Sequence, residues 1–101
     1  MNEYRPAPLD TSKVKLPEDI LELAELLAAN THDNWAQGRM NQGWTWGSER
    51  NDQKKETPCM VSYPNLPESE KEYDRVTALE TLKAIYLLGY RIDKDDSEVT
   101  L

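Results

Sequence analysis

Two stretches of this sequence begin alike and end alike, and this limits the possible folds more than any other feature. Each opens with a Leu-Pro-Glu triplet, at residues 16–18 and 66–68, and each is closed by a glycine, Gly43 or Gly89. Proline suits the first helical position, acidic residues suit the positive end of the helix dipole, and glycine commonly ends helices. The pattern predicts a mainly α fold with two principal helices, over residues 17–40 and 67–88. We interpret the shared opening as common capping chemistry, not as a repeat.

Apolar side chains recur at helical spacing within both stretches. The first stretch carries Ile20, Leu23, Ala24, Leu27 and Ala28, and Trp35 continues roughly the same stripe. The second carries Leu79, Leu82, Ile85 and Tyr86. The polar run at residues 30–34 is the weak point of the first helix, where a break or kink is expected.

The remaining segments are predicted to be irregular. Residues 1–15 should form an extended arm, because Pro6 and Pro8 disfavour helix in the residues just before them. Residues 41–66 should form a long ordered loop with at most short β segments. Its one apolar run, residues 59–63, is expected to be a strand or an extended segment packed on the helices. Tyr90 and Ile92 are expected to fold back after Gly89, and the acidic tail at 93–101 to fray.

A length of 101 residues fits a single domain, with a core at about residues 4–92. Hydrophobic residues make up only 38% of the chain and phenylalanine is absent. The core should therefore be thin, with the three tryptophans, the five tyrosines and the aliphatic residues supplying its bulk.

The charge balance and the single cysteine exclude several classes of function. A net charge of −7 disfavours nucleic acid and anionic membranes as partners. One cysteine, Cys59, allows no intrachain disulfide and no cysteine-based zinc site, so a cytoplasmic setting is expected. The first residues lack the apolar segment of a signal peptide, and no apolar run approaches the ~20 residues of a membrane span.

No catalytic or metal-binding motif stands out. One interpretation of His32 beside Asp33 is a general base oriented by a carboxylate, but a capping or surface histidine is the better interpretation. The acidic run at 93–96 lacks the glycine of a calcium loop. Cys59 is expected to be buried and inert. We therefore expect a protein that is not an enzyme and that needs no cofactor or metal.

Aromatic and basic residues gather in the middle of the chain. The candidate ligand-binding residues are Trp35, Arg39, Trp44, Trp46, Arg50 and Asp52. Tryptophan rings and guanidinium groups together can stack a flat ring and pair with an anion. The same residues can instead form a clasp that holds the long loop to the first helix, with the arginines paired to carboxylates. The sequence leaves both open and leans toward the clasp.

Many positions together resemble the RyR domain, the module repeated in the cytoplasmic part of ryanodine receptors. The resemblance covers residues 4–92. Its motifs are Tyr4-Arg5-Pro6-Ala7-Pro8, Asp10-Thr11-Ser12, Leu16-Pro17, Ala29-Asn30, His32-Asp33-Asn34-Trp35-Ala36, Arg39, Gly43-Trp44, Trp46-Gly47, Arg50-Asn51-Asp52, Lys55, Pro58, Val61, Tyr63, Leu66-Pro67-Glu68, Glu70-Lys71, Tyr73-Asp74-Arg75, Glu80-Thr81-Leu82-Lys83 and Leu88-Gly89-Tyr90. The departures, at Trp46, Ser48, Asn51 and Thr57, all fall in the loop.

The resemblance implies a mostly helical domain that binds rather than catalyses. Chains with a single copy resemble bacterial or phage proteins. The repeats of ryanodine receptors occur as tandem pairs with pseudo-twofold symmetry, which implies that a single copy can pair as a homodimer. Small-molecule ligands, including nucleotide-like ones, are one expectation for such a module. Assembly with itself or with a partner protein is the alternative.

Overall fold

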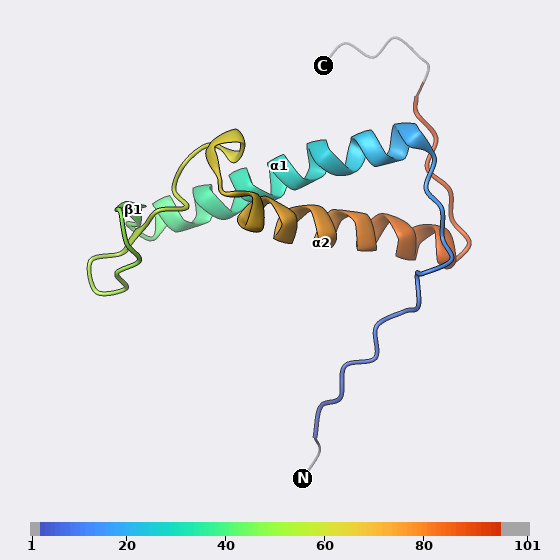
Figure 1. Cartoon of the computed structure of the whole chain (residues 1–101), viewed down its shortest axis with the longest axis horizontal. Helices are drawn as coiled ribbons and strands as arrows, with labels where there is room; N and C mark the ends of the chain where they lie inside the picture. The colour runs from blue at the N-terminus through green and yellow to red at the C-terminus, as the bar shows by residue number, and fades with distance from the viewer. Residues whose placement is uncertain (1–2, 96–101) are drawn as a thin grey trace.

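Two antiparallel helices form the frame of the molecule in the computed structural model, which describes residues 3–95 (Figure 1). Helix α1 spans Glu18–Asn41 and helix α2 spans Glu68–Leu87. Between them lie two short strands, β1 (Thr45–Trp46) and β2 (Glu56–Thr57), and a 3-10 turn, η1 (Tyr63–Asn65). The predicted fold class is confirmed: mainly α, with two principal helices joined by a long loop. None of the described helices is both long and apolar enough to cross a membrane.

Both helices begin one residue later than the sequence predicts. Pro17 and Pro67 are the N-cap residues, with ψ angles of 156° and 150°, so they lie in the extended region. The carbonyl of Pro17 accepts hydrogen bonds from the N–H groups of Ile20 and Leu21, both at 3.0 Å. Proline thus supplies a fixed φ and the first acceptor of each helix, while its missing N–H is not needed at this position.

Both helices end at glycine, as predicted. Gly43 has φ +92° and Gly89 has φ +98°, in the left-handed region that favours glycine. After α1, the N–H of Gly43 donates to the carbonyl of Met40, and the N–H of Trp44 donates to that of Arg39, each at 3.0 Å. The same pair of bonds closes α2 around Gly89. This is the Schellman motif, which satisfies the last carbonyl groups of a helix.

The expected break at residues 30–34 is absent, and α1 is continuous. His32 is the reason, because it continues the buried stripe that begins at Ile20, Ala24 and Ala28. Only 4% of His32 is exposed, and its Nε2 lies 2.6 Å from the carbonyl oxygen of Val61. The polar run therefore contains a residue with a buried partner, and the helix passes through it without interruption.

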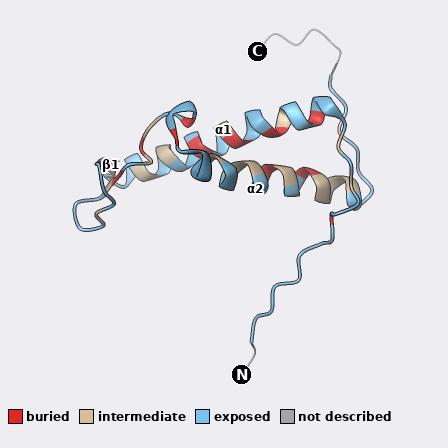
Figure 2. Cartoon of the chain, in the orientation of Figure 1, coloured by how far each residue is buried: buried red, intermediate tan, exposed pale blue. Residues whose placement is uncertain are grey.

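The core is thin, as expected, but its composition differs from the prediction. One apolar cluster joins the helices through Ile20, Ala24, Ala78 and Leu82, and a second joins α1 to the loop through Ala28, Tyr63 and Leu66. Buried segments occur on both helices and in the loop in Figure 2. Small alanines on both helices allow a close approach. The expectation that tryptophan supplies core bulk is wrong: Trp35 and Trp46 are 36% and 56% exposed, and Trp44 is half-buried.

The last turns of α1 extend past the beginning of α2, and the loop covers this distal part (Figure 1). Strands β1 and β2 pair in parallel, with Thr45 opposite Glu56 and Trp46 opposite Thr57. The alternative of a strand at residues 59–63 is wrong, because the chain runs instead into the 3-10 turn, where Pro64 cannot donate to a ladder. Cys59 and Val61 nevertheless pack on the Ala28 cluster, as the extended alternative predicts.

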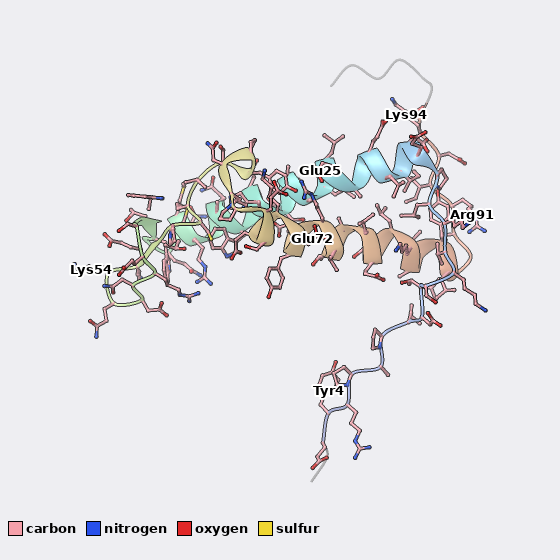
Figure 3. All side chains as sticks on the ribbon, in the orientation of Figure 1. Tyr4, Glu25, Lys54, Glu72, Arg91 and Lys94 are labelled. Atoms are coloured by element: carbon pink, nitrogen blue, oxygen red, sulfur yellow. The ribbon has the colours of Figure 1, made fainter. Side chains whose placement is uncertain are left out.

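The two ends of the described chain behave differently. Residues 3–10 form an extended, exposed arm that leaves the helices (Figures 1 and 3), as predicted. Ile92 folds back on the helix–helix cluster as expected, but Tyr90 does not, with 68% of its surface exposed. Most of the predicted fraying tail, residues 96–101, lies outside the described residues.

Candidate functional site

The six candidate residues all lie around the distal end of α1. Trp35 and Arg39 belong to α1, Trp44 follows its closing glycine, Trp46 lies in β1, and Arg50 and Asp52 lie in the turn region before β2. The structure brings five of them into one connected group and leaves Trp46 apart.

Arg39 contacts two tryptophan rings. Its Cζ lies 5.9 Å from the ring centroid of Trp35 and 5.1 Å from that of Trp44. The first contact follows from the spacing of four residues on one helix face. The second follows from the Schellman motif, which brings the residue after the glycine back over the last turn. The end of α1 therefore builds this cation–π pair from local geometry.

Arg50 extends the group and carries its own counter-ion. Its Cζ lies 5.7 Å from the Trp44 ring centroid, and its Nε donates to Oδ1 of Asp52 at 2.8 Å. This hydrogen bond lowers the pKa of the Asp52 carboxyl group, and the charge of Arg39 lowers it further. Arg39 itself makes no ion pair within 4 Å to any carboxylate of residues 3–95. The clasp hypothesis, in which both arginines pair with carboxylates, thus holds for Arg50 alone.

His32 holds Trp35 in position. The two rings stack with centroids 5.5 Å apart and an interplanar angle of 26°. The bond to Val61 requires that Nε2 of His32 carries the proton and donates it to the carbonyl. The prediction of a surface or capping histidine is wrong. A signal was present in the sequence, because His32 follows Ala28 by four residues on the buried stripe.

A pocket of about 400 Å³ opens beside Trp35. On the side of α1 and the loop it is lined by His32, Trp35, Arg50, Thr57, Pro58 and Cys59, and on the other side by Leu66, Glu70, Tyr73 and Asp74. Of the six candidate residues, only Trp35 and Arg50 line it. Arg39, Trp44 and Asp52 contact those two from outside, and the 56% exposed Trp46 lies elsewhere.

The wall formed by α2 was not predicted from the sequence. Tyr73 and Asp74 follow Glu70 by three and four residues, so both lie on the face of α2 that carries Glu70. Tyr73 is 75% exposed, which makes it an aromatic residue available to a ligand. The spacing was visible in the sequence, but the docking of α2 against α1 decides which face meets Trp35.

The pocket has a mixed electrostatic character. Arg50 lies on one side and the carboxylates of Glu70 and Asp74 on the other. Burial raises the pKa of the Cys59 thiol, and the charge of Glu70 raises it further. The thiol is therefore protonated at neutral pH, as expected for an unreactive cysteine, although Cys59 is half-buried rather than buried.

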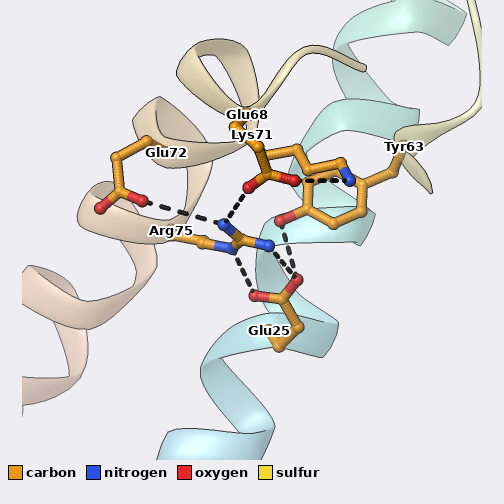
Figure 4. Close-up of polar contacts among 6 residues, drawn as sticks. All are labelled: Glu25, Tyr63, Glu68, Lys71, Glu72 and Arg75. Atoms are coloured by element: carbon orange, nitrogen blue, oxygen red, sulfur yellow. Dashed lines mark hydrogen bonds and ion pairs between the residues drawn. The ribbon is translucent and has the colours of Figure 1, made fainter. Parts of the chain in front are cut away.

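A second polar cluster ties α1 to the start of α2 and contributes nothing to the pocket (Figure 4). Arg75 donates through Nε to Glu25 at 2.8 Å and through Nη1 to Glu68 at 3.0 Å, and Glu72 lies 3.8 Å away. The hydrogen bond from Arg75 lowers the pKa of Glu25. The Tyr63 hydroxyl donates to the same carboxylate at 3.0 Å, and burial raises the pKa of Tyr63.

The comparison with known families agrees with this geometry. The RyR domain matches residues 4–94, which include the arm, both helices, the loop and every residue that lines the pocket. The predicted resemblance over residues 4–92 is therefore confirmed at the level of the family. The chain belongs to the RyR domain family.

Proposed function

We propose that this chain is a non-catalytic binding module and that the pocket beside Trp35 takes a small, nucleotide-like molecule with a flat ring and an anionic group. One observation carries the proposal. Trp35 keeps 36% of its surface exposed and lines a pocket of about 400 Å³ together with an arginine. That volume falls within the range usual for small-molecule sites.

The ring of the ligand would stack on Trp35. His32 stacks with Trp35, and Arg39 contacts it, so the indole is held in one orientation before a ligand arrives. Such preorganisation reduces the entropy lost on binding. Tyr73, 75% exposed on the opposite wall, offers a second aromatic surface.

The polar groups of the pocket match a ligand with an amino group at one end and an anion at the other. The carboxylates of Glu70 and Asp74 accept hydrogen bonds from ring amino or sugar hydroxyl groups. Arg50 would share its charge between Asp52 and a bound phosphate, and Arg39, without a carboxylate partner among the described residues, adds to the positive potential behind Trp35.

Calorimetric titration with ATP, ADP, a cyclic nucleotide and ADP-ribose tests the proposal. We expect at least one of them to bind, and we expect Trp35→Leu to weaken that binding about tenfold or more, a loss of at least ~1.4 kcal/mol. Trp46→Leu is the matched control, because Trp46 is the other markedly exposed tryptophan and lies outside the pocket. No heat and no thermal shift from any of the four ligands would contradict the proposal, as would equal losses in both variants.

Pairing with a second copy is a second candidate function, and a separate observation favours it. The chain exposes 8390 Å², whereas a compact monomer of 11.7 kDa exposes roughly 5,900 Å². Its radius of gyration is 17.2 Å, against about 13 Å for a compact domain of this length. We infer that the chain completes its burial as a homodimer. Light scattering that shows a monomer over a wide concentration range would overturn this inference.

A further inference from the structure

The N-terminal arm is the most exposed described part of the molecule. Tyr4 is 87% exposed and Leu9 is 51% exposed, and Figure 3 shows Tyr4 well away from both helices. The side chains of Glu3 and Arg5 lie 3.8 Å apart and are both more than 80% exposed. Yet the family match begins at residue 4, so the arm is part of the domain. Tyr4 and Leu9 thus place two exposed apolar side chains on a segment that belongs to the domain, where a second molecule can contact them.

The root of the arm, residues 10–12, is fixed to α2. Thr11 is only 8% exposed, and its hydroxyl donates a hydrogen bond to the Glu80 carboxylate. Asp10 then accepts from the N–H of Ser12 at 3.0 Å and from its hydroxyl at 2.6 Å, which forms a local turn. These bonds set the direction in which residues 3–9 leave the body.

A groove of about 730 Å³ lies beside this root. One wall is the arm itself, residues 8–12, and the other is the α2 segment that runs from Glu80 to Ala84. Leu9 and Ala84 give it apolar surface, while Asp10, Glu80 and Lys83 place charges in its walls. The groove therefore offers about 730 Å³ of space, with apolar surface and both signs of charge in its walls.

We propose that residues 3–7 of a second copy of this chain occupy this groove, and that the two copies exchange their arms reciprocally. The proposal rests on the pairing inferred above and names the surface that pairs. In a twofold dimer, the same patch serves both copies, so each arm tip lies against the root of the other arm. Tyr4 then covers Leu9 and Ala84 of the other copy.

The charges of the arm complement those of the groove. Arg5 of the incoming arm meets the carboxylates of Asp10 and Glu80, and Glu3 meets Lys83.

Disulfide trapping between two differently marked chains tests the exchange. In a Cys59→Ser background, one chain carries Tyr4→Cys and an isotope-labelled chain carries Ala84→Cys. Each chain then has a single thiol, so any mixed disulfide joins two copies. The matched control replaces Ala84→Cys by Lys54→Cys, at the exposed loop on the far side of the molecule (Figure 3). We expect mild oxidation to yield the Tyr4→Cys/Ala84→Cys heterodimer in clear excess over the control, as counted by mass spectrometry.

A second variant checks the same surface without a crosslink. Tyr4→Ala combined with Arg5→Ala should leave the helix content unchanged, because both side chains are almost fully exposed, and should weaken dimerisation about tenfold or more. If the Cys59→Ser chain is a monomer by light scattering, the pairing inference itself is wrong. If it is a dimer but the two crosslinks form equally, or the double variant dimerises normally, pairing stands and the arm exchange is wrong.

Discussion

The two halves of α1 differ in what surrounds the arginine side chain that lies against each of them. Where α1 lies beside α2, Arg75 is surrounded by the carboxylates of Glu25, Glu68 and Glu72 (Figure 4). At the distal end of α1, which the loop covers, Arg39 lies against the rings of Trp35 and Trp44 and has no carboxylate partner among residues 3–95. Packing on rings holds a guanidinium in position without neutralising its charge. Arg39, in this distal half of α1, can therefore attract an anion. In the paired half, the part of α1 that lies beside α2, the charge of Arg75 is already neutralised by the carboxylates that join the two helices.

The apolar contacts divide in the same way. The paired half is closed by Ile20, Ala24, Ala78 and Leu82, all less than 8% exposed. The distal half relies on His32 and on rings that stay partly open to solvent. We expect a difference in stability to follow, with the paired half setting the global free energy of unfolding and the distal half opening more easily.

The largest effect is expected from Leu82→Ala, because Leu82 is 3% exposed at the centre of the helix–helix cluster. Truncation should lower the free energy of unfolding by about 2–5 kcal/mol, a large part of what a domain this small possesses. Urea denaturation followed by circular dichroism measures it. Leu88→Ala, at a 62% exposed position just after α2, is the control and should change stability by less than ~0.5 kcal/mol. Equal losses would show that the helix pair does not dominate stability.

A smaller effect is expected from His32→Leu in the distal half. The substitution leaves the Val61 carbonyl without its donor and should cost about 1–3 kcal/mol. Because His32 stacks with Trp35, tryptophan fluorescence should change even where the helices remain folded. Asp33→Ala, at the exposed neighbouring position, serves as the control. A variant with unchanged stability and fluorescence would show that His32 does not hold the loop.

The paired half should lose stability in acid. The hydrogen bond from Arg75 lowers the pKa of Glu25 below its usual value near 4.5 in the folded state. A group with a depressed folded pKa stabilises the protein above its unfolded pKa and stops doing so as pH falls through the folded value. The free energy of unfolding should thus fall below about pH 4.5, and Glu25→Gln should flatten that fall. Glu22→Gln, on the exposed side of α1, should leave the pH profile unchanged.

The smallest change in stability is expected from Arg39→Met, which keeps the aliphatic stem but removes the cation. Its loss should be limited to the cation–π contribution at a partly exposed site, about 0.5–1 kcal/mol. Nucleotide affinity should fall as well, if Arg39 adds to the positive potential behind the pocket. Arg75→Met should do the reverse and weaken the helix pair without changing affinity. Equal changes in stability and in nucleotide affinity in the two variants would show that the two halves of α1 do not differ in this way.

The parts of this structure that could be predicted are those that depend on neighbouring residues. Proline before each helix and glycine after it act locally, so the helix ends could be placed to within one residue. The contact of Arg39 with Trp35 follows from helical spacing in the same way.

The parts that could not be predicted depend on contacts distant in sequence. Glu70 and Tyr73 reach the pocket only because α2 docks with that face toward Trp35. The two-residue strands form where Gly47 donates to the carbonyl of Thr57, an approach so close that a side chain at Gly47 would meet Glu56. The exposure of the tryptophans depends on how far the loop covers α1, which no local pattern encodes.

The most direct test of the contrast between the halves is an NMR titration with whichever nucleotide binds. The three tryptophan indole N–H groups and the arginine Nε–H groups report on both halves at once. We expect the largest shifts at Trp35, Arg39 and Arg50, with Trp46 and Arg75 unchanged. Shifts that centre on Arg75 and Lys71, or that spread evenly over all basic side chains, would contradict a ligand site at the distal end of α1.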